Sequence, residues 1–218
     1  MSKEKIEVLE DIYAENDRIS SIIKKEFEKK GIFGVNVLGS PGAGKTTTLI
    51  QLIKRMPEIK CYVVEGDIES DIDTVALKKI GIDATQINTR GACHLDAIMI
   101  QNSIGEFELK DDGILFIENI GNLVCTAEFN IGEHIKMVIA SVAEGCDKPY
   151  KYPLIFENAD VILLNKVDLM PYIDFDEEFF LKGIRALNPH VPVFKVSGKT
   201  GEGFDEAAKW LETKKKNY

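Results

Sequence analysis

Residues 32–46 read IFGVNVLGSPGAGKT, and this stretch decides the fold. Its first seven residues are mostly apolar and lie between two glycines, which is typical of a buried strand. The residues from Gly39 to Thr46 fit G-x-x-x-x-G-K-[ST] without a mismatch, and a helical pattern over residues 45–55 follows. A strand, a glycine-rich turn and a helix in this order are the context in which the motif binds phosphate. The stretch therefore predicts a phosphate-binding loop (P-loop) at the carboxyl end of a strand.

The residue types of the P-loop suit a nucleoside triphosphate. Glycines let backbone N–H groups turn inward around phosphate oxygens, and the following helix adds its positive amino end. Lys45 places a charge on the β- and γ-phosphates, and the Thr46 hydroxyl can bind Mg²⁺. We expect the nucleotide to contact Gly39, Ser40, Pro41, Gly42, Ala43, Gly44, Lys45, Thr46 and Thr47.

Outward from the P-loop, apolar runs alternate with helical patterns. Helices are predicted over residues 3–29, 45–55, 70–80, 94–104, 176–187 and 204–214, and strands over residues 32–38, 61–64, 114–117, 136–141, 161–164 and 193–196. The stretch ATQINTRGA at residues 84–92 is interpreted as a polar connection. This alternation predicts an α/β fold of the P-loop NTPase type, with a mainly parallel sheet and helices on both faces. Residues 1–30 are expected to form an N-terminal helix that packs on a nucleotide-binding domain of residues 31–218.

The composition excludes several classes of protein. The net charge is −9, which disfavours a protein whose main task is to grip nucleic acid or an anionic membrane surface. No run of 18 apolar residues is present, and the charged start MSKEKIEVLEDIYAENDR lacks the apolar stretch of a secretory signal. Four scattered cysteines are too few for a disulfide framework. We therefore expect a cytoplasmic protein with reduced thiols and with no nucleic-acid or membrane partner.

A second motif follows the apolar run at residues 161–164. Asn165, Lys166 and Asp168 form N-K-x-D, and a carboxylate at Asp168 can accept two hydrogen bonds from the N1–H and N2–H₂ edge of guanine. Adenine lacks that donor pair and would leave a buried carboxylate unpaired, so such a site rejects it strongly. Lys166 can lay its aliphatic stem along a face of the base, and Asn165 can brace the loop.

A third strand end completes the pattern. The apolar run at residues 193–196 is followed directly by Ser197, Gly198 and Lys199, and a backbone N–H there could meet the guanine O6. Together with the P-loop and N-K-x-D, this loop resembles the P-loop GTPases. GTP is therefore the expected nucleotide, and residues 31–218 are the expected GTP-binding G domain.

Two acidic residues end apolar strands: Asp67 follows CYVVEG, and Glu118 follows ILFI. A phosphate-bound Mg²⁺ needs few protein oxygens, so Thr46, Asp67 and Glu118 could supply them. Ordinary small GTPases carry D-x-x-G where this chain has Glu118-Asn-Ile-Gly121, and the Gly121 N–H could bond the γ-phosphate. No Gln stands at the usual water-positioning place and none of the four arginines is an obvious arginine finger. We expect Lys45, Thr46, Asp67, Glu118 and Gly121 to support slow GTP hydrolysis.

Soft metal ligands gather near the expected γ-phosphate turn. Cys93 and His94 follow a polar stretch, and Cys125 lies four residues after Gly121. Thiolate and imidazole suit Zn²⁺, Ni²⁺ and Cu⁺, although the spacing alone is a weak signal. A shift at Gly121 would move Cys125 against Cys93, which would couple the phosphate state to metal coordination. Three ligands leave a position open for transfer or for a second subunit.

Cysteines and histidines elsewhere are interpreted as non-ligands. Cys61 lies inside a predicted strand and Cys146 in an acidic loop. His134 and His190 are expected to be structural or solvated.

The strings VLGSPGAGKTT, VVEGDIESDIDT, ATQINTRGACHLDA, ILFIENIGNLVC, DKPYKYPLIF and LLNKVDL together resemble one family. It is the HypB family of hydrogenase nickel incorporation GTPases, in the SIMIBI class of P-loop proteins. The resemblance spans roughly residues 30–200 and implies GTP hydrolysis coupled to nickel delivery during maturation of [NiFe] hydrogenase. It also implies a GTP-dependent homodimer that holds Zn²⁺ or Ni²⁺ at its interface on Cys93, His94 and Cys125. The implied partners are a small zinc-binding nickel accessory protein and the hydrogenase large subunit.

The chain also departs from this family. Many members carry an N-terminal cysteine cluster or a His-rich stretch, whereas this sequence has no Cys before Cys61 and no His before His94. We therefore expect no separate N-terminal nickel store. Thr126 follows Cys125 where Pro is common, which predicts a less rigid loop. The family further suggests that Lys148 or Lys151 serves the dimer or the nucleotide.

Other readings remain open at this stage. A urease accessory GTPase shares the class and the nickel task, but its typical Cys-Pro-His motif does not occur here. A chaperone GTPase for cobalamin-dependent enzymes would leave the Cys/His set unexplained. A P-loop kinase needs several arginines in a closing lid, and this chain has four in all. A metal-binding interaction protein that uses GTP only as a structural ligand would not release phosphate at steady state.

Overall fold

The computed structural model describes the chain except residues 1–2, 68–71, 90, 107–108 and 110–111. The side chains of residues 3–10, 67, 72, 73 and 106 also lie outside the described part. The predicted role of the Asp67 carboxylate and the start of the helix predicted at residue 70 therefore fall outside it.

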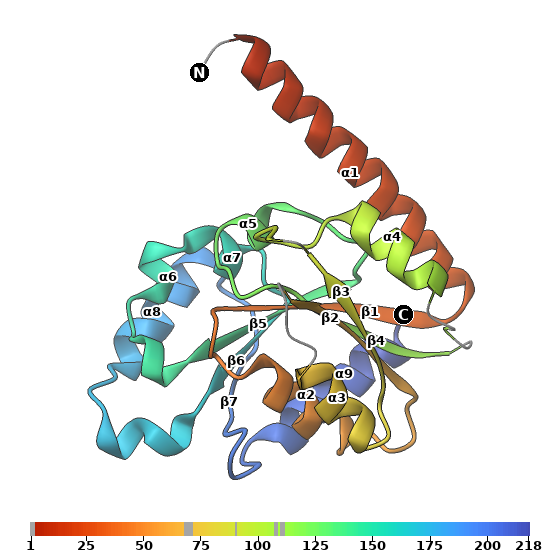
Figure 1. The fold of residues 1–218 in the computed structure, drawn as a ribbon. Helices are drawn as coiled ribbons and strands as arrows, with labels where there is room; N and C mark the ends of the chain where they lie inside the picture. Colours follow the sequence, from red (N-terminus) through yellow and green to blue (C-terminus); the bar gives the residue numbers. More distant parts are fainter. Residues whose placement is uncertain (1–2, 68–71, 90, 107–108, 110–111) are drawn as a thin grey trace.

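Seven parallel strands form the sheet, in the order β3-β2-β4-β1-β5-β6-β7 (Figure 1). They are β1 (Ile32–Gly39), β2 (Cys61–Asp67), β3 (Asp83–Asn88), β4 (Gly113–Glu118), β5 (Ile135–Ser141), β6 (Val161–Asn165) and β7 (Val193–Lys195). β1 lies at the centre, and its P-loop leaves the same edge of the sheet as the loops after β4 and β6. Because ligands of such sheets bind beyond the carboxyl ends of the strands, this edge is the place to look for the site.

Helices cover both faces of the sheet (Figure 1). One face carries α2 (Lys45–Ile53), α3 (Ile72–Lys79) and α9 (Phe204–Lys216). The other carries α1 (Lys3–Lys29), α4 (Ala97–Glu106), α5 (Cys125–Glu128), α6 (Lys148–Lys151), α7 (Pro153–Glu157) and α8 (Glu177–Leu187). Two 3-10 helices span Val142–Glu144 and Val167–Tyr172. The predicted fold class, a mainly parallel α/β sheet with helices on both faces, is confirmed.

The apolar alternation of β1 explains how it anchors both layers. Phe33, Val35 and Val37 pack in the core under α2 and α9. Ile32 joins the core under α1 and α4, and Asn36 is fully buried within the strand. A buried amide needs partners, so Asn36 predicts a polar network on this side of the sheet.

Two predictions along the chain are wrong. Residues 84–92 are not only a connection, because β3 occupies their first half at the edge of the sheet; its partly exposed residues give no apolar run. The helix predicted from His94 begins instead at Ala97, and the Asp96 carboxylate accepts a hydrogen bond from the Met99 N–H at its amino end (2.8 Å). His94 is therefore a loop residue. The short helices α5 to α7 were also not predicted, because single turns carry little periodicity.

The carboxyl-terminal half of α1 holds the helix on the domain. Ile19, Ile23 and Phe27 are buried with residues of α4 and β1, while the amino-terminal half extends past the sheet in Figure 1. Across the described residues, we find no helix both long and apolar enough to cross a membrane.

Candidate functional site

The P-loop adopts, at two places, a left-handed backbone conformation that favours glycine. Gly42 and Gly44 have φ angles of 74° and 93°. A side chain at Gly44 would also place its Cβ 2.5 Å from the Asn165 amide nitrogen. Lys45 is buried, and its Nζ lies 3.4 Å from the Ser40 carbonyl at the other side of the loop. The lysine is thus folded over the loop, where a phosphate would be bound.

Asn165 ties the expected base-binding loop to the P-loop. Its amide nitrogen donates to the Ala43 carbonyl (2.9 Å). Its carbonyl oxygen accepts from the backbone N–H groups of Lys166 (2.7 Å) and Gly198 (3.0 Å). One fully buried side chain therefore fixes three loops relative to one another. This gives structural content to the bracing role predicted for Asn165.

The remaining residues of these loops are held close by. Lys166 has a left-handed backbone (φ 61°), and its Nζ donates to the Gly42 carbonyl (2.6 Å). The Ser197 hydroxyl donates to the Asp168 carboxylate (2.6 Å) and accepts from the Thr200 N–H (3.1 Å). The Ser197 hydroxyl thereby fixes the orientation of the Asp168 carboxylate. Lys199 is exposed at the rim of the same loop.

Two of the three expected Mg²⁺ ligands, Thr46 and Glu118, meet at the start of α2. The Thr46 hydroxyl donates to the Glu118 carboxylate (3.0 Å), and Glu118 is buried at the end of β4. Strand pairing sets Glu118 beside Glu65 of β2, two residues before Asp67. Sequence reasoning missed Glu65, which is buried and accepts a hydrogen bond from Thr74 (2.5 Å).

Gly121 packs directly on the P-loop. A Cβ at Gly121 would lie 2.7 Å from the backbone nitrogen of Pro41, so no side chain fits without displacing the loop. The next residue, Asn122, forms an isolated antiparallel bridge with Gly39. The turn after β4 is therefore in contact with the loop that would hold the phosphates.

The fold brings together Cys93, His94 and Cys125, which their spacing along the chain alone could not show. Their candidate ligand atoms all lie within 4.8 Å of one another, and the Cys93 sulfur lies 3.5 Å from His94 Nδ1. Cys93 is exposed, while His94 and Cys125 are half-buried. Two thiols and an imidazole in this arrangement could hold a soft metal ion.

The pKa shifts of the cluster act in opposite senses on its two kinds of ligand: the Cys93 thiol holds its proton more firmly, whereas His94 loses its proton more readily. A hydrogen bond with Cys125 raises the pKa of the Cys93 thiol, and burial adds to this effect. Burial lowers the pKa of His94, which keeps its imidazole neutral and able to act as a ligand. The His94 ring stacks on Phe129 with centroids 4.0 Å apart, which fixes its plane.

Two asparagines connect the cluster to the phosphate side, and sequence reasoning missed both. The Asn119 side-chain oxygen accepts from the N–H groups of Leu95 and Ile120 (3.0 Å each). The Asn122 side-chain oxygen accepts from the N–H groups of Val124 (2.7 Å) and Cys125 (3.2 Å). The only signal in the sequence is a pair of amides in the turn after an apolar strand.

Other predicted residues lie outside this arrangement. Lys148 lies 4.0 Å from Glu144, and Lys151 pairs with Asp147 (2.5 Å), both on the segment after β5. Cys61 is buried, and burial raises the pKa of its thiol to about 12. Cys146 is half-buried in a separate apolar cluster.

Comparisons with known proteins found a matching family and similar chains. A family model described as "CobW/HypB/UreG, nucleotide-binding domain" matches residues 34–195. The hydrogenase maturation factor HypB of Azotobacter chroococcum mcd 1 is 43% identical over 208 residues, which cover 95% of this chain and 68% of that protein.

Two solved structures are also similar. The crystal structure of HypB from Helicobacter pylori in complex with nickel has a TM-score of 0.89 at 35% identity, covering 93% of this chain and 96% of that one. The hydrogenase maturation factor HypB from Archaeoglobus fulgidus has a TM-score of 0.86 at 36% identity, covering 93% and 99%.

Proposed function

Because this chain belongs to the CobW/HypB/UreG family of nucleotide-binding domains, and within it to the HypB hydrogenase maturation factors, we propose that it is a GTP-hydrolysing nickel chaperone. In this proposal it loads nickel on Cys93, His94 and Cys125 and delivers it for maturation of [NiFe] hydrogenase. GTP binding and hydrolysis time the loading and release.

The guanine preference rests on Asp168. Its carboxylate is held by Ser197 at the mouth of the loop that Asn165 braces. A fixed carboxylate can accept both donors of the guanine edge, and adenine would leave it unpaired. The phosphates then lie in the P-loop, where Lys45 neutralises charge and the positive amino end of α2 faces them.

The residues at the start of α2 fit Mg²⁺. A hydroxyl and a carboxylate, from Thr46 and Glu118, lie 3.0 Å apart, and such hard oxygen donors are what Mg²⁺ prefers. We assign these two and Asp67 as its ligands, direct or through water. When bound, Mg²⁺ would offset the charge that develops on the phosphates.

Hydrolysis is expected to be slow. Arg18 pairs with Glu15, Arg55 pairs with Asp205, and the Arg185 guanidinium donates to the Val191 carbonyl. None of these three is directed to the P-loop, and the fourth, Arg90, lies outside the described residues. A timer that releases cargo needs a slow step, and this arrangement supports one.

In this proposal the metal ion is the cargo of the protein. Three soft ligands leave a coordination position that a water, a second protomer or an acceptor protein can fill. We propose that a GTP-dependent homodimer completes the site with Zn²⁺ or Ni²⁺. We also propose that a small zinc-binding accessory protein and the hydrogenase large subunit are its partners. A cytoplasmic location would keep the four free cysteines reduced.

One observation carries the proposal: the turn after β4 touches both sites. Gly121 lies against Pro41 of the P-loop, while Asn119 binds Leu95, the residue after His94. Asn122 in the same turn binds the N–H of Cys125. A γ-phosphate that moves this turn therefore shifts both metal-bearing segments, the one with Cys93 and His94 and the one with Cys125.

The test is a nickel titration of the protein with GTP or GDP bound and at matched oligomeric state. We expect one Cys93- and Cys125-dependent site per protomer, with a dissociation constant that differs at least severalfold between the two nucleotides. The matched control is Cys146→Ala, which leaves the site intact. Equal nickel affinity in both nucleotide states would contradict the delivery mechanism, and GTP that stays uncleaved with metal and partner present would contradict the hydrolase assignment.

A further inference from the structure

One short segment of α1 contacts both metal-bearing segments. The Tyr13 hydroxyl donates to the Glu128 carboxylate (2.7 Å), and Glu128 ends the one-turn helix that begins at Cys125. One turn along, Asn16 accepts from the N–H of Ala97 (2.9 Å), three residues after His94. Its amide nitrogen donates to the Asn130 carbonyl (2.8 Å). Residues three apart share a face of a helix, so one face of α1 binds both segments.

An aromatic contact reinforces these bonds. The Tyr13 ring packs on Phe129 with centroids 5.1 Å apart, and Phe129 stacks on His94 at 4.0 Å. A ring on α1 is thus separated from a candidate metal ligand by one other ring. Aromatic pairs at these distances restrict each other's orientation as well as burying area.

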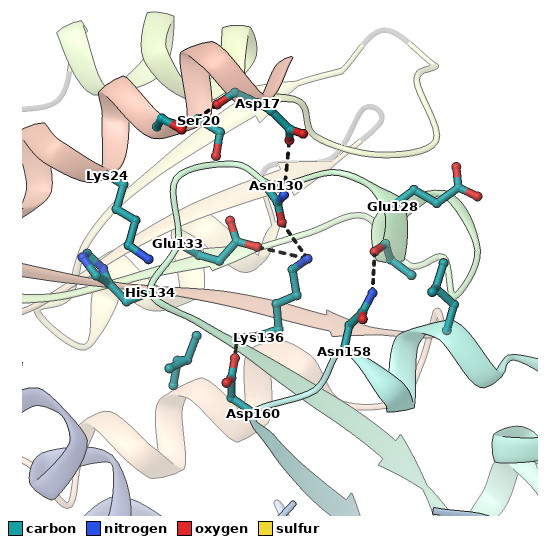
Figure 2. A pocket seen from close by; sticks show the side chains of 14 residues that line it. Asp17, Ser20, Lys24, Glu128, Asn130, Glu133, His134, Lys136, Asn158 and Asp160 are labelled. Carbon is teal, nitrogen blue, oxygen red and sulfur yellow. Dashed lines mark hydrogen bonds and ion pairs between the residues drawn. The ribbon is translucent and has the colours of Figure 1, made fainter. Parts of the chain in front are cut away.

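The segment that leads from α5 to β5 makes further polar contacts with α1, where the two border an open cavity. A cavity of about 870 Å³ lies between α1, this segment and α7 (Figure 2). Within it, Asn130 donates to Asp17 (3.2 Å) and accepts from Lys136 (2.9 Å), as Figure 2 shows. Here the segment is held to α1 by hydrogen bonds, while its next residues, Ile131 and Gly132, pack closely on the helix.

We propose that Tyr13 and Asn16 are positioning residues that set the geometry of the Cys93–His94–Cys125 site from α1. This inference rests on the proposed function, because it concerns the same metal site. Asn16 fixes the start of α4 and so the carboxyl-terminal end of the loop that carries His94. Tyr13 fixes the end of α5 and the ring that stacks on His94.

Neither residue is needed to hold α1 on the domain. Ile19, Ile23 and Phe27 bury the helix further along its length. Loss of the Tyr13 hydroxyl or of the Asn16 amide should therefore leave α1 in place while the two metal-bearing segments lose a common reference. This separates a positioning role from a purely structural one.

The experiment uses the full chain and Co²⁺ as a spectroscopic probe of the thiolate and imidazole ligands. The variants are Tyr13→Phe, which keeps the ring, Asn16→Leu, which removes both amide bonds, and Asn16→Asp, which keeps only the acceptor. The matched control is Arg18→Ala, since Arg18 is exposed on the same helix and, among the described side chains, bonds Glu15 alone. Each protein is measured for Co²⁺ affinity, visible absorption, GTP affinity and thermal midpoint.

We expect Tyr13→Phe and Asn16→Leu to weaken Co²⁺ binding by about tenfold and to alter the d–d absorption bands, as loss of outer-sphere partners commonly does. GTP affinity should stay unchanged, Asn16→Asp should recover part of the loss, and Arg18→Ala should match the parent. Parental Co²⁺ affinity and spectra in Tyr13→Phe and Asn16→Leu would overturn the inference, and where Asn16→Leu does not fold, parental values in Tyr13→Phe alone would do so. A parent protein whose Co²⁺ binding is insensitive to Cys93→Ser would instead overturn the proposed function.

Discussion

The nucleotide-binding loops and the metal-bearing segments lie at one edge of the sheet but are held in different ways. The single side chain of Asn165 bonds the P-loop, its own loop and the loop at Gly198, and it is fully buried. Cys93 is exposed, and Cys125 sits on a helix of one turn. The metal-bearing segments are positioned by amide side chains that are not themselves ligands. We infer from this difference that the nucleotide-binding loops are fixed before a nucleotide binds, whereas the metal-bearing segments can shift when the nucleotide changes.

The most severe way to break this comparison is Lys45→Ala. The lysine folds over the P-loop, where its charge would offset that of the phosphates. We expect GTP affinity to fall by about two orders of magnitude or more, while the Cys/His cluster still binds metal but no longer distinguishes GTP from GDP. Isothermal titration with each nucleotide and with nickel checks this, and retained tight GTP binding would contradict the P-loop assignment.

A change at the base end should weaken GTP while leaving the P-loop intact. Asp168→Asn removes a carboxylate that Ser197 has aimed in advance. We expect roughly hundredfold weaker GTP and a shift of preference toward xanthosine triphosphate, whose O2 can accept from the new amide. Competition between the two nucleotides measures the shift, and the control is Lys199→Ala at the exposed rim.

Substitution of Asn119 should uncouple the metal-bearing segments from the nucleotide-binding loops. Asn119→Ala leaves the buried N–H of Leu95 and the amide of Asn36 without these partners, at a cost of about 1–3 kcal/mol for each buried group. We expect the ratio of nickel affinities in GTP and GDP to shrink, whereas Asn119→Asp keeps the acceptor for Leu95 and should keep most of that ratio. An unchanged ratio in Asn119→Ala would place the coupling elsewhere.

The smallest effect concerns pH and sharpens the comparison at the segment that runs from the metal site to β5. Burial, with Lys24 adding to it and Glu28 opposing it, lowers the pKa of His134 to about 4; its Nδ1 accepts from the Gly34 N–H (2.7 Å). The unfolded chain takes up the proton first, so the stabilisation is complete above about pH 6.5 and is lost as pH falls toward 4. Thermal midpoints of His134→Gln, which keeps an acceptor, should depend less on pH across that window. An identical pH profile would contradict this.

The sequence was sufficient to predict the fold class, because apolar runs mark the central strands. Its fixed spacings of glycine, lysine and asparagine also predicted the residues of the nucleotide loops. The edge strand β3 was missed because its half-exposed residues carry no run. His94 was placed in a helix because the apolar pattern of α4 continues back through Leu95, which is itself buried.

The metal region shows where such reasoning stops. Cys93, His94 and Cys125 could be named from their chemistry, but their proximity follows from the loops after β3 and β4 meeting above the sheet. Asn119 and Tyr13 carry no motif, since an amide or a phenol becomes informative only when its partners are in place. Their roles are properties of the packed structure rather than of any spacing along the chain.

The closeness of the two thiols has a practical consequence for anyone who purifies the protein. Cys93 is open to solvent, and its sulfur lies within 4.8 Å of that of Cys125. Dissolved oxygen or peroxide can remove two electrons from such a pair and join the sulfurs, and the product offers no thiolate to an incoming ion. Nickel stoichiometries are therefore meaningful only alongside a thiol count on the same sample, kept under reductant until the ion is added.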